Sequence, residues 1–118
     1  LSGRYSKATD IRAKELGIVH CYQGFLNKKK KLIEICDKIN VSVNEVAYIG
    51  DGLVDIPVFE EVGLPISVPN AHFYAKEKTV YTTKLFGGNG AFYEVVELIL
   101  KEQGIYEQVI NKMKKDVF

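Results

Sequence analysis

Two acidic residues four positions apart, Asp51 and Asp55, are the strongest candidates for chemistry in this sequence. They belong to the segment Gly50-Asp51-Gly52-Leu53-Val54-Asp55, which directly follows the apolar run Val46-Ala47-Tyr48-Ile49. A carboxylate at the end of a buried strand points into a crevice, where Mg²⁺ could bind through one or two carboxylates, waters and a substrate phosphate. The same residues could also form an ordinary turn with an aspartate cap at a helix start, so the motif alone leaves both interpretations open.

Two further segments could bind an anion. Ser2-Gly3-Arg4 follows Leu1, which looks like the last residue of a strand, and a hydroxyl beside free N–H groups can hold a phosphate; a plain serine N-cap would use the same residues. The run from Lys28 to Lys31 follows a Gln-Gly turn. One of these lysines could reach the crevice and neutralise a phosphate, whereas most of the run belongs on a solvated helix face. His72 could line the crevice or cap a helix.

Alternating helices and strands must position these segments. Apolar residues three to four apart predict helices over 5–16, 27–40, 56–62 and 91–103, a helical turn over 71–76 and a helical tail over 105–118. β-Branched and aromatic runs predict strands over 18–22, 46–49, 64–68 and 79–83, with 46–49 buried on both faces. This alternation predicts a parallel sheet with right-handed crossovers and a site at the carboxyl ends of its strands.

The composition is that of one globular domain. The 118 residues are 47% hydrophobic and 26% charged, which excludes disordered and fibrous classes. Lys and Arg number 16 and Asp and Glu 15, so the net charge of +1 gives no reason to expect a nucleic acid or an anionic membrane as partner. The two cysteines make no disulfide framework, so we expect reduced thiols in a cytoplasmic protein. The chain starts at Leu1 without an initiator Met, and we expect it to be a fragment that begins inside an element.

Three pieces, in this order, resemble motifs II, III and IV of the haloacid-dehalogenase phosphatases: Ser2-Gly3-Arg4, the lysine after Tyr22-Gln23-Gly24, and Gly50-Asp51-x-x-x-Asp55. Three longer segments are similar in sequence to the 3-deoxy-D-manno-octulosonate 8-phosphate phosphatases, which are capless members of that superfamily. These segments are YQGFLNKK, VAYIGDGLVDIPVFEEVGLPISVPNAH and GGNGAFYEVVELIL. The resemblance implies a Rossmann-like three-layer α/β/α fold with a mainly parallel sheet, truncated at its N-terminal side. Residues 1–104 would be the phosphatase core and residues 105–118 a helical tail. A homotetramer and a sugar-phosphate substrate are also implied.

The resemblance implies roles on the anion-binding side of the site. Ser2 would hydrogen-bond the transferring phosphoryl group, and Gly3 would lie in the same substrate-binding turn. Arg4 would contact the substrate or a neighbouring subunit. Lys28 would be the motif III lysine, since it falls where the family has Asn-Lys after Gln-Gly, and Lys29 is the alternative.

On the acidic side, the resemblance implies that Asp51 ligates Mg²⁺ and that Asp55 supports the site and orients its neighbours. Two positions depart from the family. Gly52 stands where members often carry a second Asp, which removes one carboxylate but keeps the ligand position at Asp51. Asn89 stands where members commonly have Arg, which removes a cationic contact to the sugar acid or its phosphate and leaves the exact substrate open.

The family attacks phosphorus with an Asp-x-Asp motif that precedes motif II, and these 118 residues contain no Asp-x-Asp. We therefore expect negligible phosphatase activity from this polypeptide alone. Two alternatives keep the fold: the C-terminal domain of an acylneuraminate cytidylyltransferase, or a phosphatase of nonulosonate 9-phosphates. A receiver-like signalling domain is a third, but receivers place the acidic pair early and the lysine late, the reverse of the order here.

Overall fold

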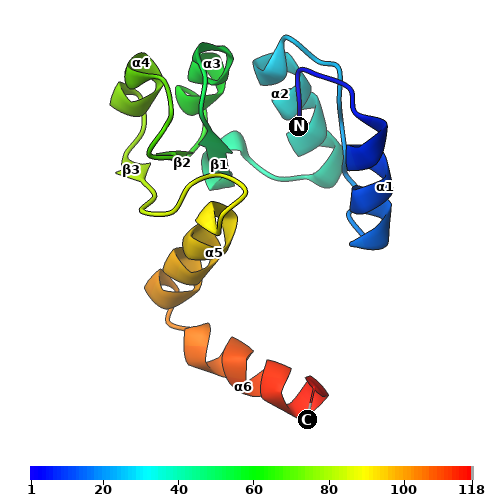
Figure 1. The fold of residues 1–118 in the computed structure, drawn as a ribbon, viewed down its shortest axis with the longest axis vertical. Coiled ribbons are helices and arrows are strands. Elements are labelled where there is room, and N and C mark those ends of the chain that lie inside the picture. Colours follow the sequence, from blue (N-terminus) through cyan, green and yellow to red (C-terminus); the bar gives the residue numbers. More distant parts are fainter. Residues whose placement is uncertain (118) are drawn as a thin grey trace.

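A three-stranded parallel sheet lies at the centre of the computed structural model, which describes residues 1–117 (Figure 1). Its strands are β1 (Ala47–Gly50), β2 (Leu64–Ser67) and β3 (Tyr81–Thr82), in the order β1-β2-β3. Ala47 of β1 is in register with Leu64 of β2, and Ile66 of β2 with Tyr81 of β3. All the strands run in one direction, as the alternation of helices and strands predicts, so their carboxyl ends share one edge of the sheet.

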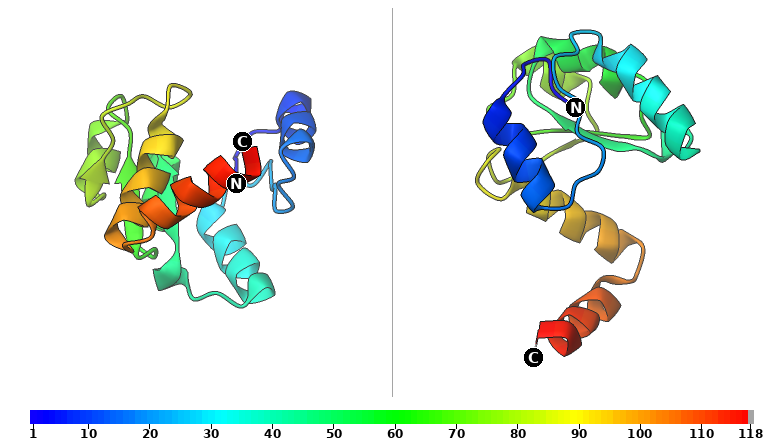
Figure 2. Two further views of the ribbon diagram at one scale, coloured as in Figure 1. Left: turned by 90° about the horizontal axis from the view of Figure 1, so that it is seen from below. Right: turned by 90° about the vertical axis from the view of Figure 1, so that its right-hand side faces the viewer.

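Helices cover both faces of this sheet and make the three layers that the family resemblance implies (Figures 1 and 2). One layer holds α2 (Lys28–Ile39), α3 (Ile56–Phe59) and α4 (Phe73–Glu77), and α5 (Ala91–Glu102) lies on the opposite face. The helix α1 (Lys7–Glu15) lies at the α2 end of the molecule, apart from the sheet, and α6 (Tyr106–Val117) extends away from the sheet beyond α5 (Figures 1 and 2). Short 3-10 turns, Val43–Glu45 and Leu53–Asp55, flank β1. No helix within residues 1–117 has the length and apolarity that a membrane crossing requires.

The core has one cluster on each side of β1. Tyr48 packs against the cluster on the α2 and α3 side, which is built from Leu32, Cys36, Val58 and Val62. Ile49 packs against the cluster on the α5 side, which is built from Val68, Ala71 and Ala91. Successive side chains of a strand point to opposite faces, so β1 joins the two clusters through neighbouring residues. Its carboxyl end, where the candidate site begins, is thereby fixed from both sides.

Local capping explains why α2 begins and ends where the sequence predicts, whereas the helix predicted over 56–62 is shorter and ends at Phe59. The Asn27 side chain accepts the N–H of Lys30 at 3.1 Å and starts α2, and Asn40 adopts the left-handed conformation (φ 57°) and ends it. The helix predicted over 91–103 is α5, and the predicted tail helix is α6; Phe118, its last predicted residue, lies outside the described residues. α1 is also present, but Ala13 is its only buried residue.

The strand predicted over 18–22 is wrong. Within residues 1–117 none of residues 18–22 lies in a strand; the one isolated bridge nearby joins Gln23, just after the segment, to Ser2, and Val19 is 86% exposed. Its β-branched residues have the propensity for a strand, but propensity in a sheet reflects packing against a neighbour, and no described strand lies along this segment. Leu1, interpreted as a strand end, likewise lies outside any strand and packs against the core cluster of α2 and α3.

The prediction that 46–49 is buried on both faces is also wrong. Among the described residues, β1 pairs only with β2, so it is an edge strand with Ala47 exposed and its other residues half-buried. The middle strand β2 has the buried pattern instead, from Pro65 to Ser67. The strand predicted over 79–83 shortens to Tyr81–Thr82. A continuous apolar run therefore identified a strand correctly but not its place in the sheet.

Candidate functional site

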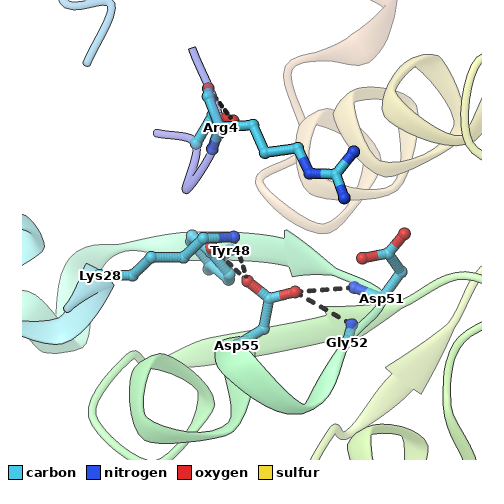
Figure 3. A network of polar contacts seen from close by, with 7 residues as sticks. Arg4, Lys28, Tyr48, Asp51, Gly52 and Asp55 are labelled. Carbon is cyan, nitrogen blue, oxygen red and sulfur yellow. Dashed lines mark hydrogen bonds and ion pairs between the residues drawn. The ribbon is translucent and has the colours of Figure 1, made fainter. Parts of the chain in front are cut away.

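The Asp55 carboxylate is the centre of the candidate site. It is 2% exposed, and four donors surround it (Figure 3). One oxygen, Oδ1, accepts from Lys28 Nζ at 2.8 Å and from the Tyr48 hydroxyl at 2.7 Å. The other, Oδ2, accepts from the backbone N–H groups of Asp51 at 3.0 Å and Gly52 at 3.1 Å. This carboxylate therefore links α2, β1 and the turn after β1 through a satisfied buried network.

The backbone brings Asp55 to this position by a tight return. The chain leaves β1 at Gly50 and makes the 3-10 turn Leu53–Asp55, which carries the side chain back under the end of the strand. A Cβ at Gly50 would lie 2.6 Å from Asp55 Cγ, closer than real Cβ contacts come. Only glycine leaves room for the carboxyl group there, so packing against Asp55 explains why position 50 is a glycine.

The cation beside Asp55 is Lys28 rather than Lys29. The side chains of Lys28 and Asp55 are 13% and 2% exposed, whereas Lys29 pairs with Glu61 at 2.7 Å on the surface. Burial raises the pKa of Asp55, but the hydrogen bonds from Lys28, Tyr48 and the Gly52 amide outweigh it. The pKa of this carboxyl therefore lies below its ordinary value, and Asp55 is ionised at neutral pH.

Asp51 differs from Asp55 in that its carboxylate is exposed and makes no ion pair within residues 1–117. Its side chain points away from Asp55, toward the side on which Arg4 lies (Figure 3). Its carbonyl oxygen accepts the N–H of His72 at 2.9 Å, while His72 Nδ1 accepts the N–H of Tyr74 at the start of α4. His72 thus caps a helix and also holds the Asp51 backbone. Lys28, Tyr48, Asp51 and Asp55 all line one open cavity of about 260 Å³.

Ser2, Gly3 and Arg4 lie next to this cavity. A Cβ on Gly3 would lie 3.9 Å from Lys28 Cε, and the Arg4 side chain extends over Asp51 (Figure 3). The Ser2 hydroxyl donates to the Arg4 carbonyl at 2.9 Å and accepts the Arg4 N–H at 3.2 Å. The Ser2 N–H donates to the Tyr22 carbonyl at 2.8 Å, which ties this turn to the segment before α2. The structure therefore places Lys28, Asp51 and Asp55 in the cavity wall and the Ser2-Gly3-Arg4 turn beside it, next to Leu1, which lines the cavity.

Sequence reasoning missed two residues that shape this region. Tyr48 lies inside an apolar run and was predicted only as part of a strand, and the run carries no signal that its hydroxyl reaches a residue seven positions later. Glu94 of α5 accepts from the Tyr81 hydroxyl at 2.7 Å and from the N–H groups of Lys84 and Leu85. It thereby anchors the loop that carries Gly87 to the cavity. An acidic residue in the first turn of a helix was the available signal for this anchor.

Comparison with known proteins matches the chain to one family. The family model described as haloacid dehalogenase-like hydrolase matches residues 1–95. The 3-deoxy-D-manno-octulosonate 8-phosphate phosphatase of Salmonella typhi is 41% identical over 104 residues, which cover 88% of this chain and 55% of that protein. The chain therefore spans about half the length of the curated relatives it matches.

Solved structures agree with this match. The crystal structure of 3-deoxy-D-manno-octulosonate 8-phosphate phosphatase from Moraxella catarrhalis, in complex with a magnesium ion, a phosphate ion and a KDO molecule, is 42% identical with a TM-score of 0.89. The match covers 94% of this chain and 64% of that one. The cobalt-bound enzyme from Haemophilus influenzae is 34% identical with a TM-score of 0.84, covering 88% of this chain and 61% of that one.

Proposed function

Because the chain belongs to the haloacid dehalogenase-like hydrolases, we propose that it forms the phosphate- and metal-binding part of a Mg²⁺-dependent sugar-acid phosphatase. The substrate proposed is 3-deoxy-D-manno-octulosonate 8-phosphate, which gives the similar proteins of Salmonella typhi and Moraxella catarrhalis their names. One observation carries this proposal: the Lys28 ammonium and the free Asp51 carboxylate lie on either side of buried Asp55 at the carboxyl end of β1. A cation and a free carboxylate at one cavity suit a phosphate and its metal ion.

The donor chemistry of the site fits Mg²⁺. Asp51 offers an exposed carboxylate oxygen, and Mg²⁺ takes one or two carboxylates with waters and substrate phosphate completing its shell. Asp55 is not available as a ligand, because both its oxygens are occupied by donors. Residues 1–117 contain no cluster of three acidic, histidine or cysteine side chains that could enclose a metal, so Asp51 would be the ligand from this chain. When bound, Mg²⁺ would offset charge on the phosphate oxygens.

The other residues would hold the phosphoryl group in place. Lys28 has three N–H donors, of which one is used on Asp55, so the ammonium can offer others to phosphate oxygens. The Ser2 hydroxyl has one proton, so it would leave the Arg4 carbonyl to donate to a further phosphate oxygen, with the turn at Gly3 beside it. Arg4 would contact the sugar acid. Asp55 would not touch the substrate; it would fix Lys28 and the Asp51 backbone in their relative positions.

The attacking group is proposed to come from an Asp-x-Asp motif, which these 118 residues do not contain. Its carboxylate would form a bond to phosphorus while the bond from phosphorus to the sugar oxygen breaks, and the leaving oxygen would take a proton. Water would then release phosphate from the acyl phosphate. We propose that residues 1–104 supply the core of this reaction and that the intact protein is a cytoplasmic homotetramer. The 118 residues alone should release phosphate at a negligible rate.

A chimera tests this function. The part of the Salmonella typhi relative that precedes its matched region would be joined to these 118 residues, and phosphate release from 3-deoxy-D-manno-octulosonate 8-phosphate measured with Mg²⁺ and with a chelator. We expect Mg²⁺-dependent turnover by the chimera. Asp51→Asn should lower kcat/KM about 100-fold, whereas Asp37→Asn, an exposed aspartate of α2, should leave it unchanged.

Three results would change the proposal. A folded chimera without turnover on this substrate would refute it, and turnover only on a nonulosonate 9-phosphate would move the substrate to that class. Hydrolysis by the 118 residues alone at an ordinary enzymatic rate would show that the attacking group lies within them.

A further inference from the structure

We propose that the Tyr48 hydroxyl is a positioning group: it fixes the orientation of the Asp55 carboxylate and thereby the place of the Lys28 ammonium. In its consequence for catalysis this inference rests on the proposed function, but the placement of Lys28 is a property of these 118 residues alone. Tyr48 belongs to β1, Asp55 to the turn after it and Lys28 to the start of α2. The hydroxyl therefore acts where three separate elements meet.

The geometry of the carboxylate divides its donors into two pairs. Oδ2 is held by the backbone N–H groups of Asp51 and Gly52, so one side of the group is bound to the turn itself. Oδ1 accepts from Tyr48 at 2.7 Å and from Lys28 at 2.8 Å (Figure 3). Of these two, the tyrosine sits on a rigid ring, whereas the lysine ends a flexible chain. Tyr48 therefore sets where Oδ1 lies, and Lys28 follows.

The Tyr48 ring is itself held in place. It meets the Phe59 ring edge to face, with centroids 5.9 Å apart, and packs against the core cluster of α2 and α3. Burial, together with the hydrogen bond to Asp55, raises the pKa of the Tyr48 hydroxyl, so it remains a donor at neutral pH. The Asp55 carboxyl group also packs closely against Gly50, where an added Cβ would lie 2.6 Å from Asp55 Cγ.

Removal of this hydroxyl should change how Lys28 is held without changing which residues face the phosphate. With Tyr48→Phe, Oδ1 keeps only the lysine as donor, so the carboxylate can turn about its last side-chain bond and draw the ammonium with it. In the active chimera we expect kcat to fall about 10- to 100-fold, the range for one hydrogen bond to a charged group, with KM nearly unchanged.

The experiment combines two readouts. In the 118-residue chain, the ¹⁵Nζ and proton resonances of the Lys28 ammonium are followed by NMR and assigned by their loss in Lys28→Met. In the chimera, kcat and KM are measured for the same variants. The matched control is Tyr106→Phe, which deletes a hydroxyl that donates to the Glu97 carboxylate at 3.1 Å between α5 and α6. Tyr48→para-aminophenylalanine restores a neutral donor at the same place.

The inference is supported if Tyr48→Phe shifts the Lys28 resonance and lowers kcat, Tyr106→Phe does neither, and para-aminophenylalanine restores both. An unmoved Lys28 resonance in folded Tyr48→Phe, or an equal shift in the control, would overturn it. If Tyr48→Phe does not fold, the para-aminophenylalanine chain decides: a resonance like wild type supports the role, and a displaced one overturns it. A shifted Lys28 resonance with an inactive wild-type chimera would leave the positioning intact and refute the phosphatase function.

Discussion

The buried pair of Lys28 and Asp55 gives a stability prediction that can be worked from its environment. Lys28→Met keeps most of the aliphatic side chain but leaves a carboxylate that is 2% exposed without its cation. Removal of one partner from a buried ion pair costs about 3–5 kcal/mol. Three neutral donors, the Tyr48 hydroxyl and two backbone amides, remain on Asp55, so we expect a smaller loss of about 2–3 kcal/mol.

The assay is urea unfolding at neutral pH, with Lys29→Met as the matched control. A loss of this size should lower the urea concentration at the unfolding midpoint by about 1–2 M, if the free energy of unfolding depends on urea as in other small proteins. Lys29 pairs with Glu61 at 2.7 Å, but both side chains are more than a third exposed, so its loss should cost about 0–1 kcal/mol.

The pH dependence supplies an independent check on the same pair. The folded-state pKa of Asp55 is lowered, so its contribution is present above the unfolded value of about 3.9 and is lost as pH falls through the folded value. The difference in unfolding free energy between wild type and Lys28→Met should therefore shrink below about pH 4. Equal losses for the Lys28 and Lys29 variants, or a difference that does not change with pH, would refute the reasoning.

Two further substitutions have outcomes set by the structure. Gly50→Ala places a Cβ 2.6 Å from Asp55 Cγ and should cost about 1–3 kcal/mol in urea unfolding, whereas Gly87→Ala, with nothing within 4 Å, should be nearly neutral. The hydrogen bond from Tyr81 is the main reason why the pKa of Glu94 lies below its ordinary value of about 4.3. The stability that Glu94 contributes should therefore be present above that pH and be lost as the pH falls through its folded-state pKa. The urea midpoints of wild type and Glu94→Gln should therefore differ at pH 7 and converge below about pH 4; midpoints that remain equally far apart would contradict this anchor.

The helices and the outline of the site could be predicted from the sequence because their signals are local. Asn27 and Asn40 bracket α2 by capping, which depends on a few neighbouring residues. A carboxylate directly after an apolar strand, Asp51, likewise needs only the strand to reach the cavity. The family resemblance singled out Lys28 as the motif III lysine of the site, but its 2.8 Å ion pair with Asp55, 27 residues later in the sequence, was found only in the structure.

What the sequence did not reveal depends on neighbours in space. The segment 18–22 has β-branched residues but no strand beside it among the described residues, so its propensity does not produce a strand. The apolar run 46–49 does form a strand, but the number of strands around it, not its composition, decides whether both faces are covered. Tyr48 was hidden for the same reason, because only the return of Asp55 under the strand gives its hydroxyl a partner.

The position of β1 at the edge of the sheet also affects how the molecule opens. The middle strand β2 is bonded on both sides and buried, whereas among the described residues β1 is bonded to β2 alone. Backbone hydrogen bonds in a strand that pairs on one side only and has fewer buried contacts break by local unfolding at a lower free energy. Hydrogen exchange should therefore be slowest in β2 and faster in β1. Asp51 and Asp55 follow directly after this edge strand, so the binding site can be lost by local unfolding of β1 and its turn while β2 remains folded.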